Sequence, residues 1–173
     1  MRRINDIRTA IRVVASLLVC GAIAQAEGFS HHGVTWGASE QQVKAAESTA
    51  PRSEGGVGDV RMLAFSAKLQ GEDATALYRF TGGKLFQISY ILTSQGRKCA
   101  ELLPVYQKVV ADLSTQYGNG AESELEGTKP CNKQQSWAAP MTGITAKIST
   151  GSQLTDLEVV YSNEGVKFEQ PMK

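Results

Sequence analysis

Apolar and polar residues alternate along six segments of the chain, and alternation with a period of two predicts half-buried β-strands. The segments are residues 61–69, 74–80, 84–93, 134–139, 143–149 and 154–162. Gly82 and Gly83 separate the second segment from the third and predict a tight hairpin. Within 61–69, the alternation puts Leu63 and Phe65 on the core side.

Two further segments have helical spacing or a helix start signal. Ser39 and Gln42 form a capping box, which predicts a short helix from Glu40 to about Thr49. A longer helix is predicted from about Leu102 to Tyr117, and Gly118 ends it. Its apolar residues recur every three or four positions, at Leu102, Tyr106, Val109, Leu113 and Tyr117.

The order of these elements is a helix and three strands, followed by another helix and three strands. We therefore predict an α+β fold built from two α-β-β-β pseudo-repeats, at about 34–95 and 97–165. The helices are expected to pack on one face of an antiparallel sheet, since a sheet with one polar face must bury the other.

The N-terminal segment has the pattern of a secretory signal peptide. A basic start precedes an apolar run, and Ala24-Gln25-Ala26 supplies a cleavage site, so residues 1–26 form the leader and 27–173 a single mature domain. A lipoprotein box ending at Cys20 is the alternative, but Val19 stands where a small residue is needed. We expect a soluble periplasmic or secreted protein, with no membrane span in the mature chain.

Charge and cysteine content limit the classes of function that the sequence allows. The chain has 18 Lys+Arg and 17 Asp+Glu, and the basic leader carries part of the positive charge. The nearly balanced remainder gives no reason to expect nucleic-acid binding. Cys99 and Cys131 are the two cysteines of the exported part, and we predict that they form a disulfide.

The sequence contains no motif for a metal, a cofactor or a histidine-based catalytic site. His31 and His32 are the only histidines, and we expect them in a loose leader before the fold. One acidic pair, Asp156 and Glu158, lies two residues apart on a predicted strand and hence on one face. These carboxylates are the candidates for acid–base chemistry if the protein is a hydrolase.

The register implied by the Gly82-Gly83 turn predicts an apolar patch on the outer face of the first hairpin. Its members are Tyr78, Phe80, Leu85 and Ile91, opposite a core face with Phe86 and Ile88. Such patches often mark partner surfaces. The alternative is that the N-terminal segment with Trp36 covers them.

Several residues also support a family resemblance. Trp36-Gly37, Ser39 and Val43 form a helix entry, and Tyr117-Gly118 ends the second helix. With the two meanders, this order resembles small exported proteins of the beta-lactamase-inhibitory-protein type and small outer-membrane assembly lipoproteins. Such a resemblance concerns the fold, and fold alone does not specify function.

The expectation is a non-enzymatic periplasmic binding module, such as an inhibitor, an immunity-type protein or an envelope-assembly accessory. Its partner is expected to be another envelope protein, and the sequence leaves the oligomeric state open. A small envelope hydrolase that uses Asp156 and Glu158 is the alternative.

Overall fold

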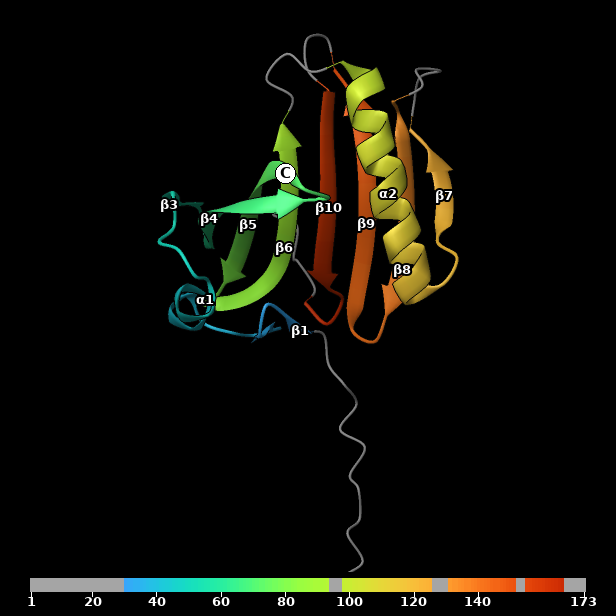
Figure 1. Ribbon diagram of the computed structural model, residues 1–173. Helices are drawn as coiled ribbons and strands as arrows, with labels where there is room; N and C mark the ends of the chain where they lie inside the picture. The colour runs from blue at the N-terminus through green and yellow to red at the C-terminus, as the bar shows by residue number, and fades with distance from the viewer. Residues whose placement is uncertain (1–29, 94–97, 126–130, 152–154, 167–173) are drawn as a thin grey trace, which may run out of the picture.

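The computed structural model describes residues 30–93, 98–125, 131–151 and 155–166, and it has the predicted α+β class. The expected signal peptide, with Cys20, lies outside these residues. The helices are α1 (Glu40–Ala46) and α2 (Cys99–Tyr117) (Figure 1). The strands are β1 (Ser30–His31), β2 (Val34–Thr35), β3 (Ser53–Val57), β4 (Val60–Leu69), β5 (Glu72–Thr81), β6 (Lys84–Thr93), β7 (Ala121–Glu124), β8 (Lys133–Ala139), β9 (Thr142–Thr150) and β10 (Thr155–Asn163).

Eight strands form one antiparallel sheet in the order β3-β4-β5-β6-β10-β9-β8-β7, and β1 pairs with β2 separately. Strands β6 and β10 pair at the centre, with Leu92 opposite Leu157. The two edge strands, β3 and β7, are additions to the prediction, since neither 53–57 nor 121–124 is among the six predicted strand segments. Glycine-rich and acidic segments carry little strand signal, and pairing with β4 and β8 orders them here.

The capping box of α1 is confirmed. The Gln42 backbone N–H donates to Ser39 Oγ at 3.3 Å, and the Ser39 N–H donates to Gln42 Oε1 at 2.8 Å. The helix ends at Ala46, earlier than predicted, and Val43 is its one buried residue. With so little apolar surface to bury, α1 stays short.

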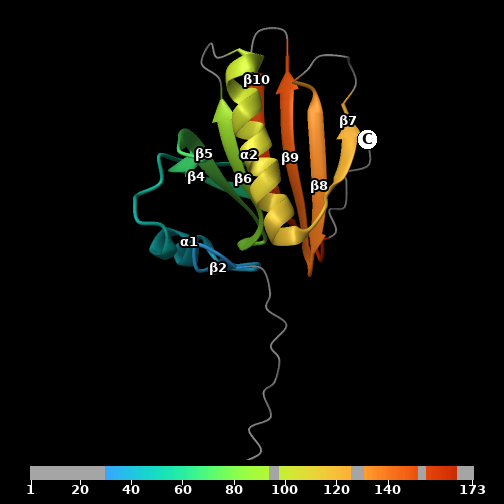
Figure 2. The same cartoon turned by 45° about the vertical axis from the view of Figure 1, so that its right-hand side comes forward.

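Helix α2 packs across β8, β9 and β10 (Figure 2) and buries Leu102, Tyr106, Val109 and Leu113. It begins at Cys99, earlier than predicted, with Pro104 inside it. The predicted Cys99–Cys131 disulfide is confirmed, with an S–S distance of 2.04 Å, and it joins the first turn of α2 to the chain before β8. Among the described residues, neither helix combines the length and apolar character needed to cross a membrane.

Candidate functional site

Most residues of the predicted apolar patch are buried in the core of the structure. Tyr78, Phe80 and Leu85 have exposed fractions of 0, 0 and 1 %. The prediction that these three side chains face solvent is therefore wrong. Ile91 differs from them, because it is half-buried and pairs with Glu158 and Thr75 on the opposite face of the sheet.

A β-bulge explains the error. Thr81 pairs with Lys84 and Phe80 with Leu85, as the Gly82-Gly83 turn predicts, but Arg79 then pairs with Gln87. The extra residue is Phe86, so Ile88 pairs with Tyr78 and the two lie on the same face, instead of on opposite faces as predicted.

The N-terminal segment stabilises this bulge through backbone hydrogen bonds. The Leu85 N–H donates to the Ala38 carbonyl at 2.9 Å, and the Gly37 N–H donates to the Leu85 carbonyl at 2.9 Å. Trp36 Nε1 also donates to Thr142 Oγ1 on β9, at 2.9 Å. The segment that begins the fold therefore contacts both halves of the sheet.

The expectation that the histidines form a loose leader is also wrong. His31 lies in β1, opposite Val34 of β2, and its ring is partly buried. Its Nε2 shares a hydrogen bond with the Tyr90 hydroxyl. The His31 ring centroid lies 5.3 Å from that of Tyr90 and 5.5 Å from that of Tyr161. His31 is thus held on the sheet between two tyrosines.

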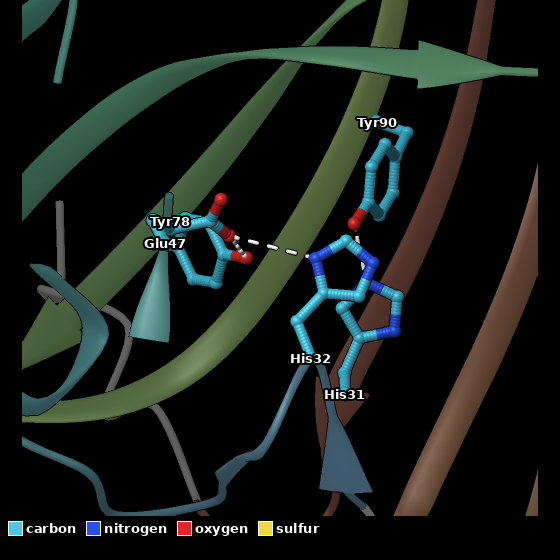
Figure 3. A network of polar contacts seen from close by, with 5 residues as sticks. All are labelled: His31, His32, Glu47, Tyr78 and Tyr90. Carbon is cyan, nitrogen blue, oxygen red and sulfur yellow. Dashed lines mark hydrogen bonds and ion pairs between the residues drawn. The ribbon is translucent and has the colours of Figure 1, made fainter. Parts of the chain in front are cut away.

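A second polar contact lies beside the first (Figure 3). The Tyr78 hydroxyl donates to Oε1 of Glu47, the residue that caps the end of α1. His32 Nδ1 lies 3.7 Å from the same oxygen. The Glu47 side chain is only 11 % exposed, whereas that of His32 is 59 % exposed. Glu47 therefore places a carboxylate against the sheet, between tyrosines and histidines.

A cleft of about 830 Å³ lies here, within the range of roughly 300–1,000 Å³ typical of ligand sites, and it is lined by His31, His32, Glu47, Tyr90 and Tyr161 among others. The end of α1, strand β4 and helix α2 form its walls, and residues of β5, β6 and β10 form its floor. Gln70 Nε2 donates to Asp112 Oδ2 at 2.5 Å and so links the β4–β5 turn to α2.

Small side chains and a short helix leave the cleft open. Ala76, Tyr90 and Val159 are aligned across β5, β6 and β10 on its floor. An alanine at position 76 fills little of the space above the sheet. Helix α1 ends at Ala46, so it contributes only its last turn and cap to the wall.

Burial controls the charge of the aromatic groups in the cleft. Desolvation, with a smaller contribution from the nearby His32, lowers the pKa of His31 from 6.5 to about 4. Desolvation likewise raises the pKa of Tyr161 to about 12. It also raises the pKa of Tyr90, and the Glu47 carboxylate raises that pKa further. At neutral pH these three rings are therefore uncharged.

The alternative catalytic pair lies elsewhere. Asp156 and Glu158 alternate along β10 with Val159 and Tyr161, which line the cleft, so the carboxylates lie on the opposite face. Glu158 is opposite Lys147 of β9 in the register. Within the described part of the chain, no group of three or more His, Cys, Asp or Glu side chains is arranged to hold a metal ion.

Sequence reasoning missed the cleft because its groups come from distant positions. Glu47 follows a short polar helix and Tyr161 lies near the end of β10, and no local pattern indicates that both line one cleft. Tyr90 lies two residues after Ile88, on the predicted core face, and its ring is buried as that alternation implies. In comparisons with known proteins, the chain matches no protein-family model, no curated protein and no solved structure.

Proposed function

We propose that this chain is a non-enzymatic binding module that holds a ligand, or a group of a partner protein, in the cleft between α1 and α2. The observation that carries the proposal is the cleft itself, with its volume of about 830 Å³. Apolar walls with a few fixed polar groups are the usual composition of a binding site. An inhibitor, an immunity-type protein or an envelope-assembly accessory would each use such a surface on another envelope protein.

The disulfide supports a location outside the cytoplasm. Cys99 and Cys131 are joined, and disulfides persist mainly in oxidising compartments such as the periplasm or the extracellular space. We therefore propose that residues 1–26 direct export and that the mature chain starts at Glu27. A lipidated Cys20 would instead anchor the same domain to a membrane.

We also propose that the domain consists of two related units whose helices pack on the same face of the sheet. The element order supports this, because α1 and α2 are each followed by four strands of one meander, rather than the predicted three. In this interpretation the cleft lies where the two units meet, since α1 and β4 come from one unit and α2 and β10 from the other. The resemblance to the beta-lactamase-inhibitory-protein type belongs to the same proposal.

Binding is favoured over the hydrolase alternative by the position of the acidic pair. A hydrolase would need its two carboxylates beside a cavity that can hold substrate. Asp156 and Glu158 lie on the sheet face opposite the cleft. The cleft lining has other carboxylates, of Glu47, Asp73 and Asp112. Asp73 pairs with Lys68, Asp112 accepts a hydrogen bond from Gln70, and Glu47 stands beside uncharged aromatic rings.

The test compares two tryptophan variants of α2. Gln116 and Gln107 are both exposed on this helix, but only Gln116 is among the cleft-lining residues. Immobilised mature protein is incubated with an envelope extract, and mass spectrometry identifies what it retains. We expect wild type and Gln107→Trp to retain the same specific partner or ligand, and Gln116→Trp to lose it because the indole fills the cleft.

Two results would contradict the proposal. Retention that Gln116→Trp leaves unchanged would place binding outside the cleft. Turnover of a cell-wall or glycan substrate, lost in an Asp156→Asn variant, would support the hydrolase instead.

A further inference from the structure

We infer that the cleft binds an organic cation, a guanidinium or ammonium group on an apolar stem, and that the Glu47 carboxylate receives it. This inference rests on the proposed function and adds the chemical class of the ligand. It follows from three features of the cleft: a largely buried carboxylate, aromatic walls and an excess of negative charge.

Glu47 is a largely buried carboxylate, with a side chain 11 % exposed, and it has no strong cationic partner. Within the described residues, no lysine or arginine nitrogen lies within 4.0 Å of it, and its one ion-pair contact is with the imidazole of His32, at 3.7 Å. A buried carboxylate is unfavourable unless it is paired. Glu47 also caps the C-terminal end of α1, where the backbone carbonyls already make the potential negative. Both effects favour a cation at this position.

The hydrogen bond from Tyr78 fixes this carboxylate. Oε1 of Glu47 accepts a hydrogen bond from the Tyr78 hydroxyl and faces His32 (Figure 3). Tyr78 is fully buried and packs edge-on against Phe65, at a centroid distance of 5.6 Å. A ligand would therefore meet a carboxylate whose position is already set, which lowers the entropy lost on binding.

Aromatic rings stand beside the carboxylate. Tyr90 and Tyr161 line the cleft, and the His31 ring lies between them. The faces of tyrosine rings carry partial negative charge and attract cations within about 6 Å of the ring centre. Guanidinium groups also stack on such rings and are weakly hydrated, so we expect a guanidinium to bind more tightly than an ammonium.

The other charged residues of the cleft lining also favour a cationic ligand. The cleft lining contains three carboxylates, of Glu47, Asp73 and Asp112, and one ammonium, of Lys68. Lys68 Nζ lies 2.7 Å from Asp73 Oδ1, so that ion pair neutralises the lysine. The apolar part of the lining suits an uncharged stem and includes Ala46, Ala67, Leu69, Ala76, Val109, Leu113 and Val159.

The experiment uses two probes that match in size and differ in charge. Isothermal titration calorimetry measures binding of Nα-acetyl-arginine amide and Nα-acetyl-citrulline amide to the mature protein. Citrulline replaces the guanidinium with a neutral urea group of nearly the same shape. We expect the arginine derivative to bind at least tenfold more tightly, with NMR shift changes concentrated at cleft residues.

Glu47→Gln is the decisive variant, because it removes the charge and keeps an oxygen that can accept the Tyr78 hydrogen bond. We expect it to weaken binding of the arginine derivative at least tenfold and to leave the citrulline derivative unchanged. The matched control is Glu54→Gln on β3, since Glu54 is exposed, pairs with Lys44 and lies outside the cleft lining. The control should bind both probes like wild type.

Three results would overturn the inference: equal affinity for the two probes, unchanged arginine affinity in Glu47→Gln, or no binding of either probe at millimolar concentration. If both probes bind equally and Gln116→Trp blocks both, the cleft binds ligands without selecting charge, and only the proposed function is supported.

A second comparison, between agmatine and the peptide Gly-Gly-Arg-Gly-Gly, distinguishes the two possible sources of the guanidinium group. Tighter binding of agmatine supports a free small molecule, and tighter binding of the peptide supports an arginine of a partner protein.

Discussion

The two halves of the sheet bury their inner faces in different ways. In the second half, α2 has 19 residues and places Leu102, Tyr106, Val109 and Leu113 over β8, β9 and β10. The seven-residue helix α1 of the first half buries only Val43. The strands of the first half compensate, because Phe65, Tyr78 and Phe80 are the three largest fully buried side chains of the described residues.

This difference shows how a short helix changes the role of a sheet. Where a long helix covers the strands, β9 buries the medium-sized Ile144 and Ile148, and one large ring, Trp137, is buried on β8. Where the helix is short, large rings on the strands fill the space instead, and the area that neither helix nor ring fills stays open as the cleft. Aromatic residues on β5 therefore indicate a thinly covered core rather than a partner surface.

The largest predicted effect tests the core role of these strand aromatics. Phe80→Ala should destabilise the protein by about 3–5 kcal/mol, because it removes a fully buried ring from a region where no long helix can move in to fill the cavity. Urea unfolding followed by circular dichroism measures this loss. Leu77→Ala is the control on the same strand, since Leu77 is half-exposed on the opposite face, and it should cost about 1–2 kcal/mol. Equal losses would show that the two faces are covered alike.

The second prediction concerns the disulfide that links α2 to the chain before β8. Helix α1 contains no cysteine and has no such link. Replacing Cys99 and Cys131 together by serine should reduce the free energy of unfolding by roughly 3–4 kcal/mol, because the bond closes a loop between residues separated by 32 positions. Urea denaturation of the variant and of reduced wild type measures the effect. A loss below about 1 kcal/mol in both would mean that packing alone holds α2 in place.

The smallest predicted effect is a dependence on pH in the first half. The folded-state pKa of His31, about 4, lies below its ordinary value of 6.5, so the unfolded state takes up a proton more readily. The His31 contribution is fully present above pH 6.5 and declines as the pH falls toward 4. We expect a loss of about 1 kcal/mol, because β1 can detach before the sheet unfolds and this limits the penalty.

NMR titration of the His31 imidazole measures this directly, and a midpoint near 4 is expected. His31→Gln should flatten the decline in stability between pH 6.5 and 4. A midpoint near 6.5 would show that the ring is exposed in solution.

Much of the fold could be predicted because its signals are local. The Ser39–Gln42 capping box, the apolar stripe of α2 and the Gly82-Gly83 turn each depend on residues close together in sequence, and each is present. On β9 and β10 the predicted faces are also correct, since Ile144, Ala146 and Leu157 are buried, whereas Lys147 and Glu158 on the other face are only partly buried. Regular alternation without a bulge makes such assignments possible.

The candidate site could not be predicted, because it depends on contacts between distant segments. The bulge at Phe86 places Tyr78 of β5 on the same face as Ile88 of β6, and beside it Leu85 exchanges backbone hydrogen bonds with residues 37–38. Nearly every residue type has the same backbone N–H and C=O groups, so a hydrogen bond between two backbone segments cannot be predicted from the local side-chain pattern. The approach of His31 to Tyr90 likewise follows from the pairing of β1 with β2 and not from a motif.

The central position of β10 determines when the molecule can be completed during synthesis. Strand β6 is synthesised before α2, but one of its two neighbours in the sheet is β10, near the C-terminal end of the described residues. Gln87 therefore has no strand partner on that side until Ser162 has been synthesised. Until residues 155–163 have left the ribosome, one edge of β6 has unpaired amide and carbonyl groups along an apolar strand. Such an edge can form hydrogen bonds with strands of other chains and so favours aggregation. The joining of the two halves is thus a non-local closing step, and the nascent first half is an unfinished sheet that needs protection while the remainder of the chain is made.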